Sequence, residues 1–98
     1  MARTTRYRES TTGDEYAIRY EEQPGGTWKM YADEHPPNPF DPSVSKCHLY
    51  SSKLICVASG KEPHAFERAQ AIAFVWMDGF SQYIRRGVFP TGRKRVHV

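Results

Sequence analysis

The clearest pattern along the chain is a helical repeat of apolar positions between Pro63 and Arg86. On a helical wheel at about 100° per residue, the apolar side chains fall in one arc of roughly 140°. The arc comprises Ala65, Phe66, Ala69, Ile72, Ala73, Trp76, Met77, Phe80, Tyr83 and Ile84, and the opposite side carries Glu67, Gln70, Asp78, Ser81, Gln82 and Arg85. The pattern predicts one long amphipathic helix over 63–86, which needs a sheet or a partner to cover its aromatic side.

The predicted helix has recognisable ends. Pro63 suits the first helical position, where a missing N–H costs nothing. Ser59 and Glu62 have the spacing of a capping box. Gly87 can adopt the left-handed conformation that ends a helix.

Three positions inside the helix are ambiguous. Gly79 either lets another part of the chain approach closely or is simply tolerated. Phe74 and Val75 lie outside the main arc. They indicate either a helix buried over a wider angle or a second contact surface, for a dimer or for a partner.

A period of two marks the segments before the helix. Residues 15–22 (EYAIRYEE) alternate between apolar and polar positions, and residues 27–33 (TWKMYAD) do so again. Between them, Gln23-Pro24-Gly25-Gly26 has proline and glycine where a type II turn needs them. This pattern predicts an antiparallel hairpin.

Two further segments complete the predicted domain. Residues 34–45 contain four prolines, which predicts a stiff extended loop. Its one large apolar residue, Phe40, either plugs the edge of the core or is exposed for a partner. Residues 46–58 favour one or two strands, with Ser51-Ser52 as a turn or a bulge. The elements predict an α+β fold, in which an antiparallel sheet of three or four strands packs one face against the long helix.

Composition is that of one small domain. The chain has 98 residues, of which 39% are hydrophobic and 13% aromatic. No run of about 18 apolar residues is present, and no apolar stretch follows the charged start. We expect a cytoplasmic protein with a domain over 14–87, a flexible basic arm over 1–13 and a basic tail over 88–98.

Positive charge is concentrated toward the two ends. Residues 1–12 carry three arginines against one glutamate, residues 85–98 carry five cations and no acid, and residues 13–84 carry ten acids against six bases. Basic ends are typical of proteins that contact polyanions, usually nucleic acid, but they are equally typical of solvated termini. Aromatic residues such as Tyr31 could stack on bases.

Catalytic and metal-binding patterns are weak. Cys47, His48, Cys56 and His64 lack the close pairs that zinc sites use. The two cysteines are expected to be free and buried, although pairing or metal binding between them stays open. Neither a nucleophile motif nor a phosphate-binding loop is present. We therefore expect no enzyme and no cofactor, with a small enzyme or a zinc-binding domain as the minor alternatives.

One segment resembles the double-stranded RNA-binding domain. Ser59, Gly60 and Lys61, followed by the alanines of 69–73, match the turn and alanine-rich helix of that family. Glu62 and Pro63 stand where the family has a second lysine, and its first helix has no counterpart here. The chain is therefore not assigned to that family.

In size and build, the predicted protein is similar to the small α+β proteins with which phages and plasmids inhibit host-defence complexes. We therefore expect a non-enzymatic accessory factor or inhibitor from a mobile element, docking on a protein or nucleoprotein complex. The alternative is a protein that binds nucleic acid directly. The predicted binding residues are Arg3, Arg6, Arg8, Tyr31, Phe40, Arg85, Arg86, Arg93, Lys94 and Arg95. A homodimer through the helix is a further possibility.

Overall fold

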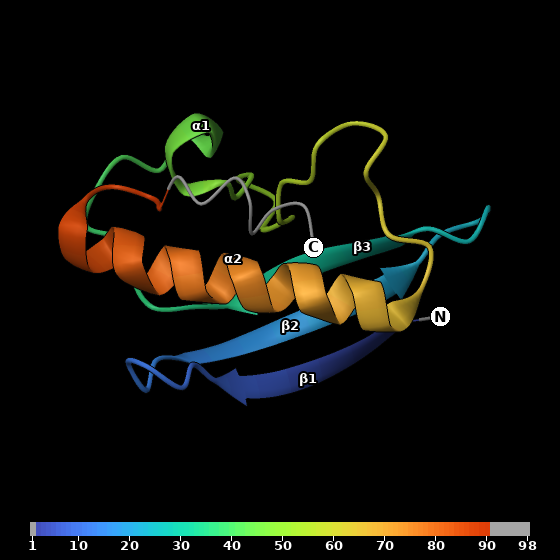
Figure 1. Cartoon of the computed structure of the whole chain (residues 1–98), viewed down its shortest axis with the longest axis horizontal. Helices are drawn as coiled ribbons and strands as arrows, with labels where there is room; N and C mark the ends of the chain where they lie inside the picture. The colour runs from blue at the N-terminus through green and yellow to red at the C-terminus, as the bar shows by residue number, and fades with distance from the viewer. Residues whose placement is uncertain (1, 91–98) are drawn as a thin grey trace.

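The computed structural model describes residues 2–90, in which a long helix lies across one face of a three-stranded antiparallel sheet (Figure 1). The strands are β1 (Ala2–Arg8), β2 (Glu15–Glu22) and β3 (Trp28–Glu34), in the spatial order β1-β2-β3. Two helices follow, α1 (Val44–Cys47) and α2 (Phe66–Arg86). The predicted α+β class and the helix on one face of the sheet are therefore confirmed.

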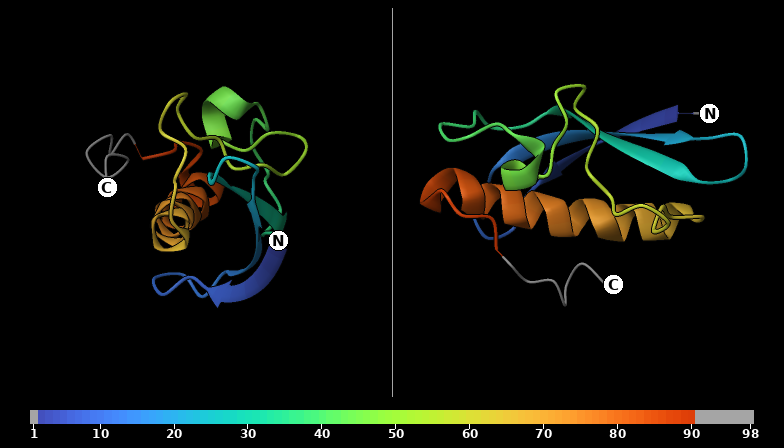
Figure 2. Two further views of the ribbon diagram at one scale, coloured as in Figure 1. Left: turned by 90° about the vertical axis from the view of Figure 1, so that its right-hand side faces the viewer. Right: turned by 90° about the horizontal axis from the view of Figure 1, so that it is seen from above.

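The predicted hairpin is formed by β2 and β3. The Gly26 N–H donates to the Gln23 carbonyl over 2.9 Å, and Gly25 has a φ of 102°. Only glycine adopts that angle without strain, which is why this sequence turns here. At the other end of the hairpin, the register shifts between Ala17 and Ile18. Such a bulge increases the local twist, and the sheet curves around α2 (Figure 2).

The prediction of a flexible arm over residues 1–13 is wrong for Ala2–Arg8. This segment is β1, and it pairs with β2 from Ala2 opposite Glu21 to Arg8 opposite Glu15. Its period of two is hidden in the sequence because only one large apolar side chain, that of Tyr7, occurs in it. The Tyr7 hydroxyl bonds to the Tyr20 hydroxyl over 2.8 Å, so one inward ring helps to fix the strand.

Helix α2 ends where predicted but begins later. Its N-cap is Ala65, which makes no side-chain cap bond, so the expected capping box does not form. Pro63 precedes the helix, and its carbonyl accepts a bond from the Trp28 N–H over 2.9 Å. At the other end, Gly87 has a φ of 78° and its N–H donates to the Tyr83 carbonyl, as expected for a glycine C-cap.

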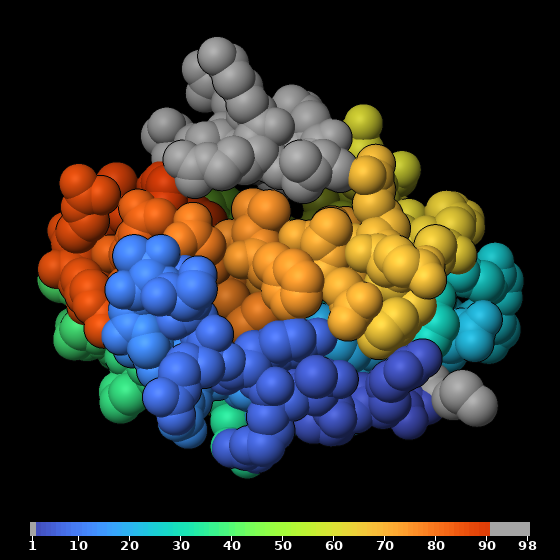
Figure 3. All heavy atoms as spheres, turned by 60° about the horizontal axis from the view of Figure 1, so that its bottom comes forward, coloured from blue at the N-terminus to red at the C-terminus, as the bar shows by residue number. Residues whose placement is uncertain are grey.

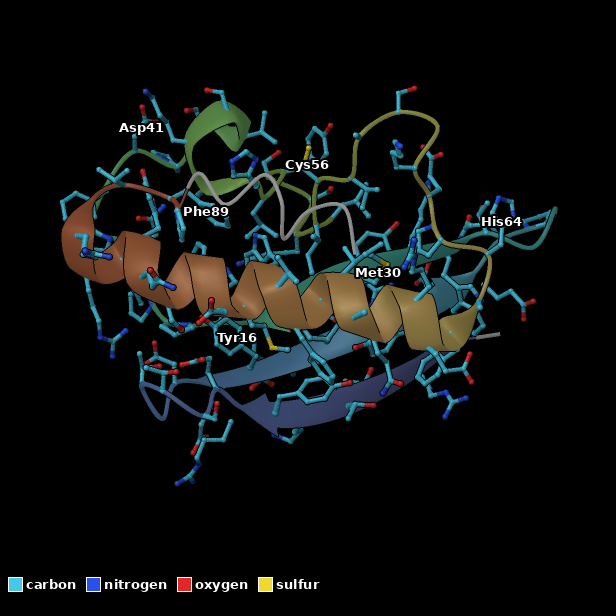
Figure 4. All side chains as sticks on the ribbon, in the orientation of Figure 1. Tyr16, Met30, Asp41, Cys56, His64 and Phe89 are labelled. Atoms are coloured by element: carbon cyan, nitrogen blue, oxygen red, sulfur yellow. The ribbon has the colours of Figure 1, made fainter. Side chains whose placement is uncertain are left out.

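The core lies between the inner face of the sheet and the aromatic side of α2. Its largest fully buried side chains are those of Tyr16, Ile18, Tyr20, Met30, Ile55, Phe80, Ser81 and Tyr83. Ser81 was predicted on the polar side of the helix, but it is fully buried. Its burial is tolerated because its hydroxyl is hydrogen-bonded to that of Tyr16 over 2.6 Å. Tyr16 lies directly beneath α2 (Figure 4).

The strand predicted over residues 46–58 does not form. The segment starts inside α1 and then makes a tight loop, in which Leu49 bridges Ile55 and the Lys53 N–H donates to the Tyr50 carbonyl. Ser51-Ser52 is therefore a turn. His48 and Lys53 have φ values of 57° and 76°, and these left-handed residues interrupt the extended backbone that a strand needs.

Candidate interaction surfaces

Arg6, Arg8 and Tyr31 lie on the outer face of the sheet, which faces away from α2. Arg6 donates to Glu34 over 2.6 Å, and both residues pair with Ala17 in the sheet register, so this ion pair spans the buried Ala17. Arg8 donates to Glu15 over 2.9 Å.

Tyr31 is covered on the same face. The guanidinium carbon of Arg19 lies 4.2 Å from the centre of the Tyr31 ring, and Arg19 also pairs with Glu21 and Asp33. Across this face, four cations stand beside four acids: Arg6, Arg8, Arg19 and Lys29 beside Glu15, Glu21, Asp33 and Glu34. The face is therefore close to neutral, and three of its arginines already have carboxylate partners.

Arg3 lies on the inner side of β1, at the margin of the core. Its guanidinium carbon is 4.0 Å from the centre of the Phe66 ring. Within residues 2–90, no carboxylate forms an ion pair with Arg3. The charge is held by a cation–π contact and stays open to a further anion.

The other predicted arginines are at the C-terminal end of α2. Arg85 makes two bonds to Asp14, of 2.6 and 3.0 Å, and joins the turn between β1 and β2 to the helix. The bond from Arg85 lowers the pKa of Asp14 to about 2, and bonds from Ser81 and Thr12 add to this effect. Among residues 2–90, the Arg86 side chain donates only to that of Gln82, over 3.4 Å. Arg93, Lys94 and Arg95 lie outside the described residues.

Phe40 is fixed against the same end of α2. Its ring meets the Tyr83 ring edge-on, with 5.9 Å between ring centres, and it lies against Gly87. The Tyr83 hydroxyl donates to the Asp41 carbonyl over 2.6 Å, and Figure 4 shows Asp41 beside the helix end. Phe40 is nevertheless 44% exposed, so one side of its ring packs against the helix end and the other faces solvent.

Four exposed residues belong to this end of α2 and to the segments that flank it, and we name them the helix-end patch: Phe40, Lys46, Arg86 and Val88. Val88 is 65% exposed. Hydrogen bonds from Ser43 lower the pKa of Asp41, and the positive charge of Lys46 adds to this effect. Within the described residues, neither Lys46 nor Arg86 has a carboxylate ion-pair partner. Val88 was not among the predicted residues because no periodic pattern covers it.

The predicted absence of a metal-ligand cluster concerns the two cysteines and the histidines near them. Cys47 is buried and Cys56 partly so, and the two are not bonded to each other. No group of three or more His, Cys, Asp and Glu side chains within residues 2–90 could hold a metal ion.

A hollow of about 220 Å³ lies at the edge of β3. It is lined by Trp28, Lys29, Met30, Tyr50, Leu54, Ile55, Val57 and Glu62. Pockets for small molecules are usually about 300–1,000 Å³, so this hollow is small for a substrate.

Comparison with known proteins gives no relative. No family model, no curated protein and no solved structure matches this chain. Within residues 2–90, no helix is long and apolar enough to span a bilayer. The helix-end patch is therefore interpreted from its own chemistry.

Proposed function

We propose that this protein is a non-enzymatic binding protein that docks on a partner protein through the helix-end patch. The observation that carries the proposal is the exposure of Phe40 and Val88 at an end of α2 where the cations Lys46 and Arg86 have no carboxylate ion-pair partner among the described residues. The matching partner surface offers an apolar pocket bordered by carboxylates. This is also the kind of contact that the expected accessory factor or inhibitor of a larger complex would need.

The patch is prepared for binding because its loop is held in one conformation. The Phe40 N–H donates to the Asn38 side chain over 2.9 Å, and the Ser43 N–H donates to the Asp41 side chain over 2.9 Å. Together with the bond from Tyr83 to Asp41, these contacts order the loop before a partner arrives. A pre-ordered aromatic anchor loses little conformational entropy on binding.

Direct binding of nucleic acid is the second candidate, and the arginine contacts favour it less. Arg6, Arg8 and Arg85 each bond to a carboxylate of the same chain. Affinity for nucleic acid rests mainly on phosphate contacts, and at each of these positions a phosphate would bind beside a carboxylate that already offsets the charge. Docking on a protein would use the exposed apolar side chains of Phe40 and Val88, for which phosphate binding has no role.

The test combines affinity capture with matched variants. The tagged protein is incubated with a nuclease-treated lysate of the cells that naturally express it, and captured proteins are identified by mass spectrometry. We expect one set of proteins that is retained by wild type and lost with Phe40→Ser and with Arg86→Glu. Tyr50→Ser is the control, because Tyr50 is 43% exposed and lines the hollow at the edge of β3 instead of belonging to the patch. Equal capture by all four proteins would refute docking through the patch.

The nucleic-acid alternative has its own measurement. Fluorescence anisotropy with labelled double-stranded DNA and RNA is recorded at about 50 and about 200 mM salt, between which phosphate-dominated affinity falls by orders of magnitude. Docking on protein predicts no binding at either concentration. Tight binding at low salt that Arg3→Ala and Arg8→Ala weaken would favour the alternative instead.

A further inference from the structure

The two edges of the sheet differ in whether another segment of the chain covers them. The edge of β3 is covered, because the Ala32 N–H donates to the Lys53 carbonyl, the Ile55 N–H donates to the Met30 carbonyl, and Trp28 bonds to Pro63. The outer edge of β1 pairs with no other segment of residues 2–90 (Figure 1). Seven residues of extended backbone are thus open on one side. An open edge is a template for another strand.

The rings of Phe74 and Tyr7 form an apolar surface beside this edge, which we call the ledge. Phe74 of α2 is 48% exposed, and its ring meets the Tyr7 ring edge-on with 5.2 Å between ring centres. Tyr7 is held in place by its bonds to Tyr20 and Gln70. Figure 3 shows β1, in dark blue, lying alongside α2, in orange. Side chains of an added strand that point toward α2 would rest on Phe74 and Tyr7.

On the opposite side of the edge, β1 itself contributes two arginines and no acid. Arg6 and Arg8 point to the outer face, and their side chains are 65% and 72% exposed. Each guanidinium uses one nitrogen for its carboxylate partner, and an arginine has five N–H donors. Both can therefore accept a second carboxylate, and exposed ion pairs of this kind are weak enough to rearrange.

A second copy of the chain fits the edge less well than an acidic segment does. Antiparallel pairing of two β1 strands would bring together two copies of Arg3, Arg6 and Arg8 with no additional acid in either strand. Arginine on an edge strand opposes this kind of self-association. The charge of β1 instead complements a partner strand that carries glutamate or aspartate.

We propose that β1 accepts an extended segment of a partner protein as a fourth strand, with apolar residues facing Phe74 and acidic residues facing Arg6 and Arg8. Backbone bonds to β1 supply affinity that does not depend on sequence. The ledge and the arginines select the alternating apolar and acidic pattern. The surface is separate from the helix-end patch, so each proposal can fail without the other.

The experiment uses a capped peptide of alternating valine and glutamate, equal in length to β1. Binding to the isotope-labelled full-length chain is followed by NMR shifts and by hydrogen exchange. We expect the β1 amides that do not bond to β2 to become protected from exchange. We also expect Phe74→Ser and Arg8→Glu each to weaken binding by about tenfold or more, as loss of an interface anchor does. Tyr50→Ser serves as the control variant and should bind like wild type.

Two peptide controls test the pattern itself. A valine–lysine peptide presents the wrong charge, and a peptide that is N-methylated at every residue has no backbone N–H to donate to the edge, so neither should bind. Circular dichroism establishes that each variant is folded, and Arg8→Gln replaces Arg8→Glu if charge reversal unfolds the chain. The proposal is overturned if β1 gains no protection or if Phe74→Ser binds with unchanged affinity. It also fails if the chain alone associates with rising concentration and thereby protects the same amides, since a second copy would then occupy the edge.

Discussion

Replacing Gly79 with alanine tests how the chain folds back after α2. A Cβ at this position would lie 2.4 Å from the tip of the Phe89 ring, much closer than real Cβ contacts allow. Phe89 lies between α2 and α1 (Figure 4), with its ring 4.6 Å from that of His48, measured between centres. Gly79→Ala must therefore displace this ring.

Two opposing effects set the size of the change. Alanine in a helix interior is more favourable than glycine by about 1 kcal/mol. Full burial of a phenylalanine side chain contributes about 1.5–3 kcal/mol, so losing a half-buried ring costs about 1 kcal/mol. Gly79→Ala alone should leave the free energy of unfolding nearly unchanged, and Phe89→Ala alone should lower it by about 1 kcal/mol. In a chain that already carries Phe89→Ala there is no ring to displace. Gly79→Ala should then raise the free energy of unfolding by about 1 kcal/mol.

The double-mutant cycle is measured by urea denaturation, with the fluorescence of Trp28 and Trp76 as the probe. An independent readout is His48, because burial lowers the pKa of its imidazole. Removing the Phe89 ring exposes His48, so both Gly79→Ala and Phe89→Ala should raise that pKa in an NMR titration. The reasoning is refuted if Gly79→Ala stabilises the chain equally with and without Phe89 and leaves the His48 pKa unchanged.

Three further predictions follow from buried and charged contacts. Tyr16→Phe leaves a buried serine hydroxyl of α2 without its tyrosine partner and should lower the free energy of unfolding by about 1–2 kcal/mol in the same urea assay. Because the pKa of Asp14 falls from 3.8 to about 2 on folding, stability that is present above pH 3.8 should be lost as the pH falls toward 2, and acid titration of Asp14→Asn should lack this component. Burial, aided by the nearby Lys53 ammonium, lowers the pKa of His35 below 6.5, so stability should be complete above pH 6.5 and decline below it. Lys53→Met should raise the pKa of His35 in an NMR titration, and an unchanged value would contradict the contact between the two side chains.

The elements that could be predicted are those whose own side chains repeat over many residues. Helix α2 has nine apolar positions of the predicted arc, and the hairpin of β2 and β3 has a proline–glycine turn between two alternating segments. In both, local pattern and tertiary packing agree. Phe74 was also marked as unusual from its position outside the arc, and it is one of the exposed rings.

The features that could not be predicted depend on contacts between distant segments or on local backbone conformation. Strand β1 is stabilised by pairing with β2 rather than by an apolar face of its own, so its sequence reads as a polar arm. Residues 46–58 have strand composition, but left-handed backbone at His48 and Lys53 closes a loop that composition does not encode. The ion pairs of Arg6 and Arg85 join residues far apart in the chain, and only the sheet register and the helix position bring them together. At Arg6, Arg8 and Arg85, the positive charge is therefore offset by a partner that the sequence alone does not reveal.

The order of the elements along the chain also constrains how the protein is made. All three strands precede α2, and an isolated sheet of this size with one uncovered face has little stability of its own. About 50 residues separate the end of β3 from the end of α2, so at about 5–20 residues per second the ribosome needs about 3–10 s to deliver the helix. During that interval the tyrosines of β2 and Met30 lack the apolar side of α2 that covers them in the folded chain. Nascent chains that stop before α2 should therefore be aggregation-prone and depend on chaperones, whereas the completed chain buries the same surface within itself.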